Sequence, residues 1–165
     1  MIYIIVFVFS LAILRFSFIF KNKAIRFVLR VIALLIPCVL ASLRSPRMTI
    51  DTAVYIEPLF RQAKMQSFTQ FIFNNTITHD VGYLLVTYLV SQLSKNVAGM
   101  FFAISALVII PAYLAIKKRY KTPGAIVVGM MILYVLLYNA SFNMARQSIS
   151  LSLGALAIKI GRAHV

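Results

Sequence analysis

The stretch VAGMFFAISALVIIPAYLAI at residues 97–116 decides the fold class, and KKRYK follows it at residues 117–121. The stretch has no charged side chain, and its length matches the roughly 20 apolar residues that a helix needs to cross a bilayer. Ser105 is its one hydrogen-bonding side chain before Tyr113. We therefore expect a membrane-spanning helix over Val97–Ile116 that ends in a basic loop.

The composition of the whole chain agrees with a membrane protein. Apolar residues make up 62% of the 165 residues, charged residues only 12%, and the mean hydropathy is +0.93. These values are typical of an integral membrane protein rather than of a soluble domain. The predicted fold class is all-α, a polytopic membrane helix bundle with about four to six transmembrane or membrane-embedded helices.

Other apolar runs divide into long and short ones. Two runs fall below the roughly 17 residues that mark the lower limit for a span, and these are Val81–Leu93 and Ser148–Ile160. Between the runs lies one long polar stretch, Arg44–Thr78. Runs long enough to span are Met1–Phe20, Phe27–Leu43, in which Pro37 is tolerated, and Gly124–Ala140.

The charge of the chain is strongly positive and unevenly placed. The formal net charge is +14, from 17 Lys and Arg against three Asp and Glu. The basic residues flank apolar runs, where the topology rule for membrane proteins places them. This arrangement argues against a nucleic-acid partner. The lone Cys38 cannot form an internal disulfide and is interpreted as a small buried hydrophobe.

The basic loops also predict the orientation. Residues 21–30 and 117–121 each hold four Lys or Arg, so both segments should be cytoplasmic. The polar stretch after the second span then lies outside. If Val81–Leu93 does not cross the membrane, both basic loops stay cytoplasmic, and Arg146 emerges on the same outer face as Arg44.

Candidate functional residues gather in three polar segments at membrane edges: LRSPRMTIDTAVY (43–55), HDVGY (79–83) and NMARQ (143–147). A guanidinium binds two phosphate oxygens at once, so the arginines suit a pyrophosphate. Arginines at span ends also snorkel as anchors. Asp51 is a candidate general base or a partner of Arg47, Asp80 a candidate helix cap, and Tyr55 and Tyr83 candidate interfacial residues.

Several site classes have no sequence signal. His79 and His164 have no second ligand at metal-binding spacing. Neither a phosphate-cradling glycine loop nor a nucleophile elbow is present in the sequence. We therefore expect neither a metal nor a cofactor.

The order of these segments resembles the EpsG-type family of exopolysaccharide polymerases, relatives of the Wzy O-antigen polymerases. The resemblance rests on the opening MIYIIVFVFSLAIL, on LRS followed by DTAVY, on HDVGYLLVTYLVSQL and on FNMARQSISLSLGALAI. Asp80 stands where the family usually has Glu, and Val81 where it usually has Pro. Motif positions fall on Arg44, Asp51, Thr52, Tyr55, Gly82, Tyr83, Asn143, Arg146 and Gln147.

The resemblance implies a glycosyltransferase-type enzyme in the bacterial cytoplasmic membrane. Such polymerases join repeat units linked to undecaprenyl pyrophosphate at the outer face, amid membrane lipids and other exopolysaccharide-assembly proteins. We assign Arg44 and Arg146 to the pyrophosphate and Asp51 to the base, as catalytic residues. Substrate-binding roles go to Arg47, Thr52, Tyr55, Asp80, Tyr83, Asn143 and Gln147.

Two other functions remain open from the sequence. A carrier or flippase for a lipid-linked or anionic glycan would use the same arginines, but Val97–Ile116 offers almost no polar path. A non-catalytic scaffold of a glycan-assembly complex is the third alternative.

The last residues, IGRAHV, do not resemble a membrane exit. The DNA string ATC GGA AGA GCA CAC GTC, the start of a common sequencing adapter, translates to the same six residues. We therefore expect residues 1–159 to be the N-terminal part of a multi-span polymerase domain and residues 160–165 to be a non-native tail. On that expectation, the fragment alone is inactive.

Overall fold

The computed structural model describes residues 2–45, 52–76, 80–138 and 140–161, and all elements within these ranges are helices. The side chains of residues 52, 53 and 159–161 are not described. The prediction of an all-α fold is confirmed. The elements are α1 (Ile2–Ser17), α2 (Lys23–Ser42), the π-helical turn η2 (Thr52–Ile56), α3 (Glu57–Met65), α4 (Phe68–Asn75), α5 (Val81–Leu93), α6 (Ala98–Arg119), α7 (Pro123–Leu136), α8 (Ala140–Asn143) and α9 (Ala145–Gly161).

Two of the described helices, α2 and α6, are long and apolar enough to cross a membrane, with mean hydropathies of 2.3 and 2.2. The apolar helices α1, α5 and α7 are shorter, at 16, 13 and 14 residues. At 1.5 Å per residue, α7 reaches about 21 Å against a hydrocarbon core of about 30 Å. The helices in the predicted spans Met1–Phe20 and Gly124–Ala140 are therefore shorter than those runs.

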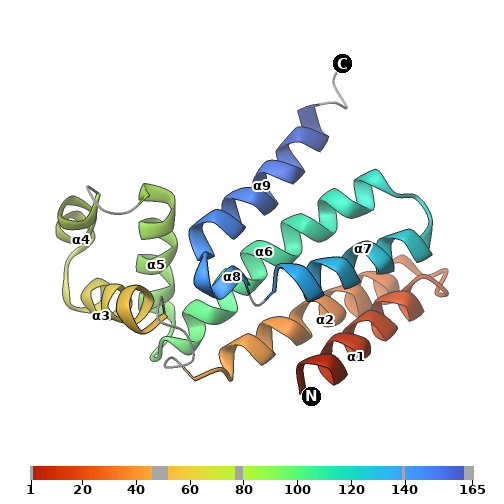
Figure 1. Cartoon of the computed structure of the whole chain (residues 1–165), viewed down its shortest axis with the longest axis horizontal. Helices are drawn as coiled ribbons and strands as arrows, with labels where there is room; N and C mark the ends of the chain where they lie inside the picture. The colour runs from red at the N-terminus through yellow and green to blue at the C-terminus, as the bar shows by residue number, and fades with distance from the viewer. Residues whose placement is uncertain (1, 46–51, 77–79, 139, 162–165) are drawn as a thin grey trace.

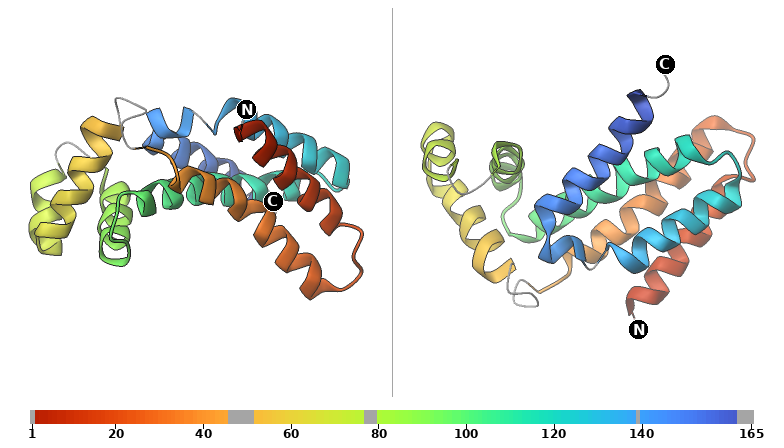
Figure 2. Two further views of the ribbon diagram at one scale, coloured as in Figure 1. Left: turned by 90° about the horizontal axis from the view of Figure 1, so that it is seen from below. Right: turned by 45° about the horizontal axis from the view of Figure 1, so that its top comes forward.

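Helix α6 forms the centre of the main bundle. It packs against α2, α7 and α9, while α1 packs against α2 and also contacts α7 (Figures 1 and 2). In its apolar window 56% of residues are buried, compared with 28% in α2. The apolar side chains of these helices form one core that includes Leu14, Ala33, Ile104 and Met130.

A polar contact between α1 and α2 compensates for a proline. Pro37 lies inside α2 and has no backbone N–H, so the carbonyl of Ala33, four residues earlier, loses its helical donor. The buried hydroxyl of Ser10 donates to that carbonyl at 2.7 Å and also lies 3.1 Å from the hydroxyl of Tyr134. The proline in α2 is therefore accommodated by a neighbouring helix, as membrane bundles allow.

The polar stretch Arg44–Thr78 contains α3 and α4. Together with α5 they form a small lobe beside the N-terminal end of α6 (Figures 1 and 2). The lobe has a core of its own, made by Leu59, Ala63, Phe71 and Leu84. Leu59 and Ala63 are four residues apart and therefore lie on one face of α3, the apolar face that packs against α5.

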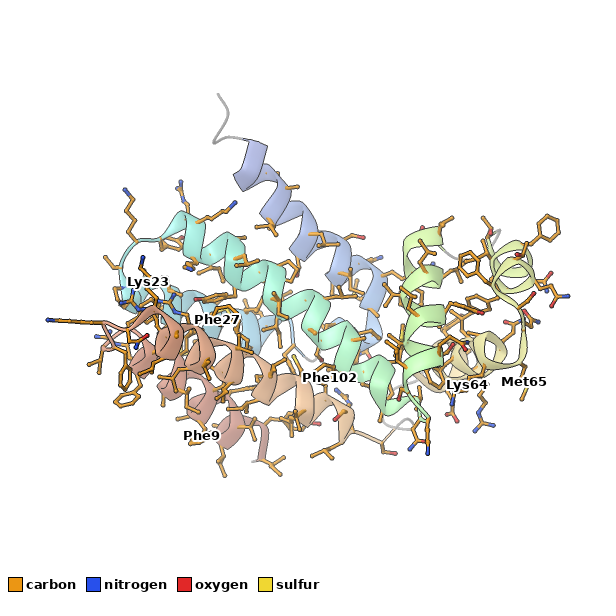
Figure 3. All side chains as sticks on the ribbon, turned by 180° about the vertical axis from the view of Figure 1, so that it is seen from behind. Phe9, Lys23, Phe27, Lys64, Met65 and Phe102 are labelled. Carbon is orange, nitrogen blue, oxygen red and sulfur yellow. The ribbon has the colours of Figure 1, made fainter. Side chains whose placement is uncertain are left out.

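Different elements lie at the two ends of the molecule. The α1–α2 and α6–α7 turns, which carry the basic loops, lie together at one end, and the α3–α5 lobe lies at the other (Figure 1). Lys23 and Phe27 mark the first end, and Lys64 and Met65 mark the second (Figure 3).

Candidate functional site

A cavity of about 340 Å³ lies where the main bundle meets the small lobe; we call it the junction cavity. Tyr83 packs against both apolar cores, so the cavity lies at their boundary. Its walls come from η2, α5 and the α8–α9 segment. The lining residues are Tyr55, Ile56, Tyr83, Phe142, Asn143, Met144, Ala145, Arg146 and Gln147.

Arg146 makes an ion pair across this boundary. It is in the first turn of α9, and its Nη1 lies 3.8 Å from Oδ2 of Asp80, the residue that precedes α5. Asp80 occupies the N-cap position of α5, but its side chain makes no capping hydrogen bond. Capping therefore does not account for Asp80, and its carboxylate stands beside a guanidinium. Both side chains are solvent-accessible.

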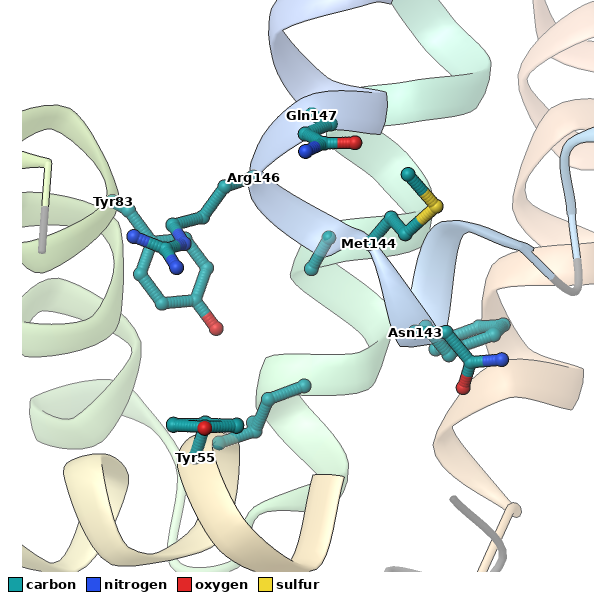
Figure 4. A pocket seen from close by; sticks show the side chains of 9 residues that line it. Tyr55, Tyr83, Asn143, Met144, Arg146 and Gln147 are labelled. Carbon is teal, nitrogen blue, oxygen red and sulfur yellow. The ribbon is translucent and has the colours of Figure 1, made fainter. Parts of the chain in front are cut away.

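Tyr83 lines the same cavity, and its hydroxyl points to the side of the cavity where Tyr55 lies (Figure 4). Burial raises the pKa of Tyr83 to about 12, although the nearby Arg146 charge acts in the opposite direction. The phenol is therefore protonated at neutral pH, where it is able to donate a hydrogen bond but not to act as a base.

Arg44 lies at a neighbouring position, on an aromatic platform. Its guanidinium carbon is 4.8 Å from the centre of the Phe142 ring, which itself contacts Phe101 and Tyr138 edge-on. The hydroxyl of Tyr138 donates to the carbonyl of Pro37 at 2.7 Å and so holds this segment against α2. The buried Nη1 of Arg44 has no hydrogen-bond partner among the described residues. Arg44 is thus fixed in place with donor capacity unused.

Arg44 lines a second cavity of about 440 Å³, which we call the basic cavity. Glu57 is its acidic side chain, and it accepts from Nη2 of Arg61 at 2.6 Å within α3. Lys64 donates to the carbonyl of Lys95 at 2.6 Å and so links α3 to the segment just before α6. The lining residues are Arg44, Glu57, Phe60, Arg61, Lys64, Lys95, Asn96, Val97 and Ala98.

The structure brings some predicted site residues together and separates others. Tyr55, Tyr83, Asn143, Arg146 and Gln147 line the junction cavity, with Asp80 paired to Arg146. Figure 4 shows Asn143 pointing away from Arg146. Arg44 lines the basic cavity instead, although its platform Phe142 lines the junction cavity. Arg47, Asp51 and the side chain of Thr52 lie outside the described residues.

Sequence reasoning missed the basic cavity around Arg44. Arg61, Lys64 and Lys95 lie in segments that the charge rule places outside, where Lys and Arg are disfavoured. This departure from the rule is the signal that marks them. No sequence feature indicated a role for Phe142, because aromatic residues are common beside membrane spans. Within the described ranges no group of three or more His, Cys, Asp or Glu is placed to hold a metal ion.

Three motif segments far apart in the sequence, at Arg44, at Asp80–Tyr83 and at Asn143–Gln147, thus meet at one end of the bundle. Residues 27–162 match the sequence model of the EpsG family. The chain belongs to the EpsG family. That membership indicates a function of the exopolysaccharide-polymerase type. Comparison with curated proteins and with solved structures gave no match.

Proposed function

We propose that this EpsG-family protein joins repeat units carried on undecaprenyl pyrophosphate, at the outer face of the bacterial cytoplasmic membrane. The observation that supports this most is the meeting of Arg146, Asp80 and Tyr83 in the junction cavity beside Arg44 on Phe142. Cations, a carboxylate and a phenol donor at one membrane edge suit transfer from a lipid pyrophosphate.

The reaction makes defined demands on these groups. The hydroxyl oxygen of the acceptor sugar attacks the anomeric carbon of the donor glycan, and the bond from that carbon to the pyrophosphate oxygen breaks. Negative charge grows on the departing pyrophosphate, where preorganised cations stabilise it. Arg146 and Arg44 supply these cations, and the junction cavity and the basic cavity, at about 340 and 440 Å³, are of a size for the pyrophosphate head groups of donor and acceptor.

The proton of the acceptor hydroxyl needs a carboxylate. Asp51 has that role in our proposal, because it directly precedes Thr52–Ile56, whose Tyr55 lines the junction cavity. Asp80 pairs with Arg146 and orients its guanidinium toward the pyrophosphate. Tyr83 donates a hydrogen bond to a phosphate or sugar oxygen.

The decisive experiment adds purified lipid-linked repeat units to membranes that contain the protein expressed from its complete gene. A ladder of polymer lengths is expected, and Arg146→Lys should lower its yield about 100-fold, because a point charge does not replace a bidentate fork. Arg119→Lys, the same exchange at the other end of the bundle, is the matched control and should retain the ladder.

Other outcomes identify the alternatives. If repeat units move across the membrane but no ladder forms, the protein is a carrier. If neither movement nor a ladder is observed, the scaffold alternative remains. A normal ladder from Arg146→Lys would return Arg146 to the role of a snorkelling anchor.

A further inference from the structure

A third cavity, of about 610 Å³, runs as a groove between α2 and α6 at the end opposite the small lobe. Its volume lies within the range of ligand pockets. Residues three or four apart form its walls, one stripe on each helix. The lining residues are Lys23, Arg26, Phe27, Arg30, Val31, Leu34 and Leu35 on α2 and Ile110, Tyr113, Leu114 and Lys117 on α6.

The groove is divided into a charged part and an apolar part. Its cations, Lys23, Arg26, Arg30 and Lys117, lie toward the basic turns, at the end that the charge rule places in the cytoplasm. Leu34, Leu35 and Ile110 continue it toward the middle of the bundle.

No carboxylate balances these cations among the residues that line the groove. The sequence has three acidic residues, and the two that the structure describes, Glu57 and Asp80, lie in or next to the small lobe. The ammonium of Lys117 is close enough to Arg30 and Arg26 for their positive charges to repel it. The cluster therefore raises a positive potential that a bound anion would relieve.

Polar atoms at the groove also lack partners. Tyr113 lines it, is 4% exposed, and its hydroxyl has no hydrogen-bond partner among the described residues. The buried Nε of Arg30 is likewise without one, although the guanidinium lies 4.4 Å from the centre of the Phe18 ring. A buried hydroxyl is costly unless it is hydrogen-bonded. An oxygen-rich group in the groove would satisfy both atoms.

We propose that this groove binds an anionic phospholipid of the cytoplasmic leaflet. Its phosphodiester would lie among Lys23, Arg30 and Lys117 and accept from Tyr113, and an acyl chain would follow Leu34, Leu35 and Ile110 inward. Basic pockets between membrane helices on the cytoplasmic side suit such head groups. A further apolar helix over the groove would leave the cations unneutralised, so charge complementarity favours the lipid. The proposal does not depend on the polymerase reaction.

The test uses the complete protein, purified in detergent and mixed with equal amounts of phosphatidylglycerol and phosphatidylcholine that carry the same acyl chains. Native mass spectrometry counts the lipids retained. Phosphatidylglycerol should be retained at least tenfold over phosphatidylcholine. Lys117→Gln should lower that preference about fivefold, the effect expected for one cation near a lipid phosphate. Lys118→Gln, the same exchange on a neighbour that does not line the groove, should leave the preference within about twofold.

Three results would overturn the proposal: equal retention of the two lipids, equal effects of Lys117→Gln and Lys118→Gln, or full competition by soluble glycerol phosphate at the lipid's own concentration. The first of these is also the result expected if another helix covers the groove. Because Arg30→Gln removes the contact with Phe18, Lys23→Gln is the second variant, and it should match Lys117→Gln.

Discussion

The two ends of this bundle are both basic, but they surround their cations with different groups. At the lobe end, Arg146 lies beside Asp80 and Tyr83, and Arg61 beside Glu57. At the other end, the described lining of the α2–α6 groove pairs four cations with apolar walls and no acid.

This difference is the basis of our two proposals, a transfer reaction at the lobe end and lipid binding at the other end. In our proposal, the transfer reaction uses Arg146 as the cation for the leaving group, Asp80 to orient that cation and Asp51 to take the proton. Holding a lipid needs only charge complementarity and an apolar surface. In these proposals the neighbours of Lys and Arg decide their roles, which a count of positive charges alone does not distinguish.

The largest expected effect concerns the sides of the membrane on which the two ends lie. In a background without Cys38, Met65→Cys and Met144→Cys should react fully with a membrane-impermeant thiol reagent added to intact cells. Both positions are well exposed, at 86% and 51%. Lys118→Cys should react only after permeabilisation. Labelling of Met65→Cys but not of Met144→Cys would end the shared-site proposal.

The second prediction concerns the arginine that stacks on Phe142. Arg44→Lys should lower polymer yield about tenfold, because an ammonium does not reproduce the flat stacking and the forked donors of a guanidinium. Arg61→Lys changes the same cavity at an exposed side chain and should lower yield no more than about twofold. Gel ladders at matched expression provide the measurement, and equal losses would contradict the special role of Arg44.

A smaller effect is expected at Tyr83. Because its pKa is raised to about 12, the phenol keeps its proton from pH 6 to 9. Tyr83→Phe should therefore lower the rate about threefold, the loss of one hydrogen bond, without changing the shape of the pH–rate curve in that range. A basic limb that disappears in Tyr83→Phe would show that Tyr83 titrates during catalysis.

The smallest effect is on stability. Asp80→Asn should change the free energy of unfolding by less than about 1 kcal/mol, because exposed ion pairs contribute little. The 3.8 Å separation and the 77% exposed side chain of Asp80 place this pair in that class. Unfolding in mixed micelles measures the change, with Glu57→Gln as the control. A larger loss would make the ion pair a structural support of the lobe.

Local hydropathy patterns predicted a helix well where the helix ends at the boundary between apolar and polar sequence. The run Val81–Leu93 coincides with α5, and α2 and α6 cover the expected spans Phe27–Leu43 and Val97–Ile116 to within one residue. The run Gly124–Ala140 was expected to be one helix, but α7 ends at Leu136. Two residues later, the hydroxyl of Tyr138 donates a hydrogen bond to the carbonyl of Pro37. A hydropathy pattern cannot predict such a contact.

The residues of the candidate site could be proposed from the sequence, but their arrangement in two cavities could not. The order of the motifs indicated Arg44 and Arg146 together, because both follow or precede apolar runs on one predicted side. Their division between two cavities depends on where the ring of Phe142 lies, and that position depends on Phe101 and Tyr138. Contacts between residues so distant in sequence have no local pattern.

The hydrogen bond from Ser10 to the Ala33 carbonyl has a consequence for how the protein is made. During synthesis α2 would enter lipid with an unsatisfied carbonyl beside Pro37, at a cost of several kcal/mol by the usual scale for hydrocarbon. Among the described residues, the hydroxyl that donates to this carbonyl comes from Ser10 of α1 and lowers this cost. We therefore expect the insertion machinery to retain α1 until α2 arrives and to release the two together as a hairpin, with Tyr134 joining the same hydroxyl once α7 has been translated.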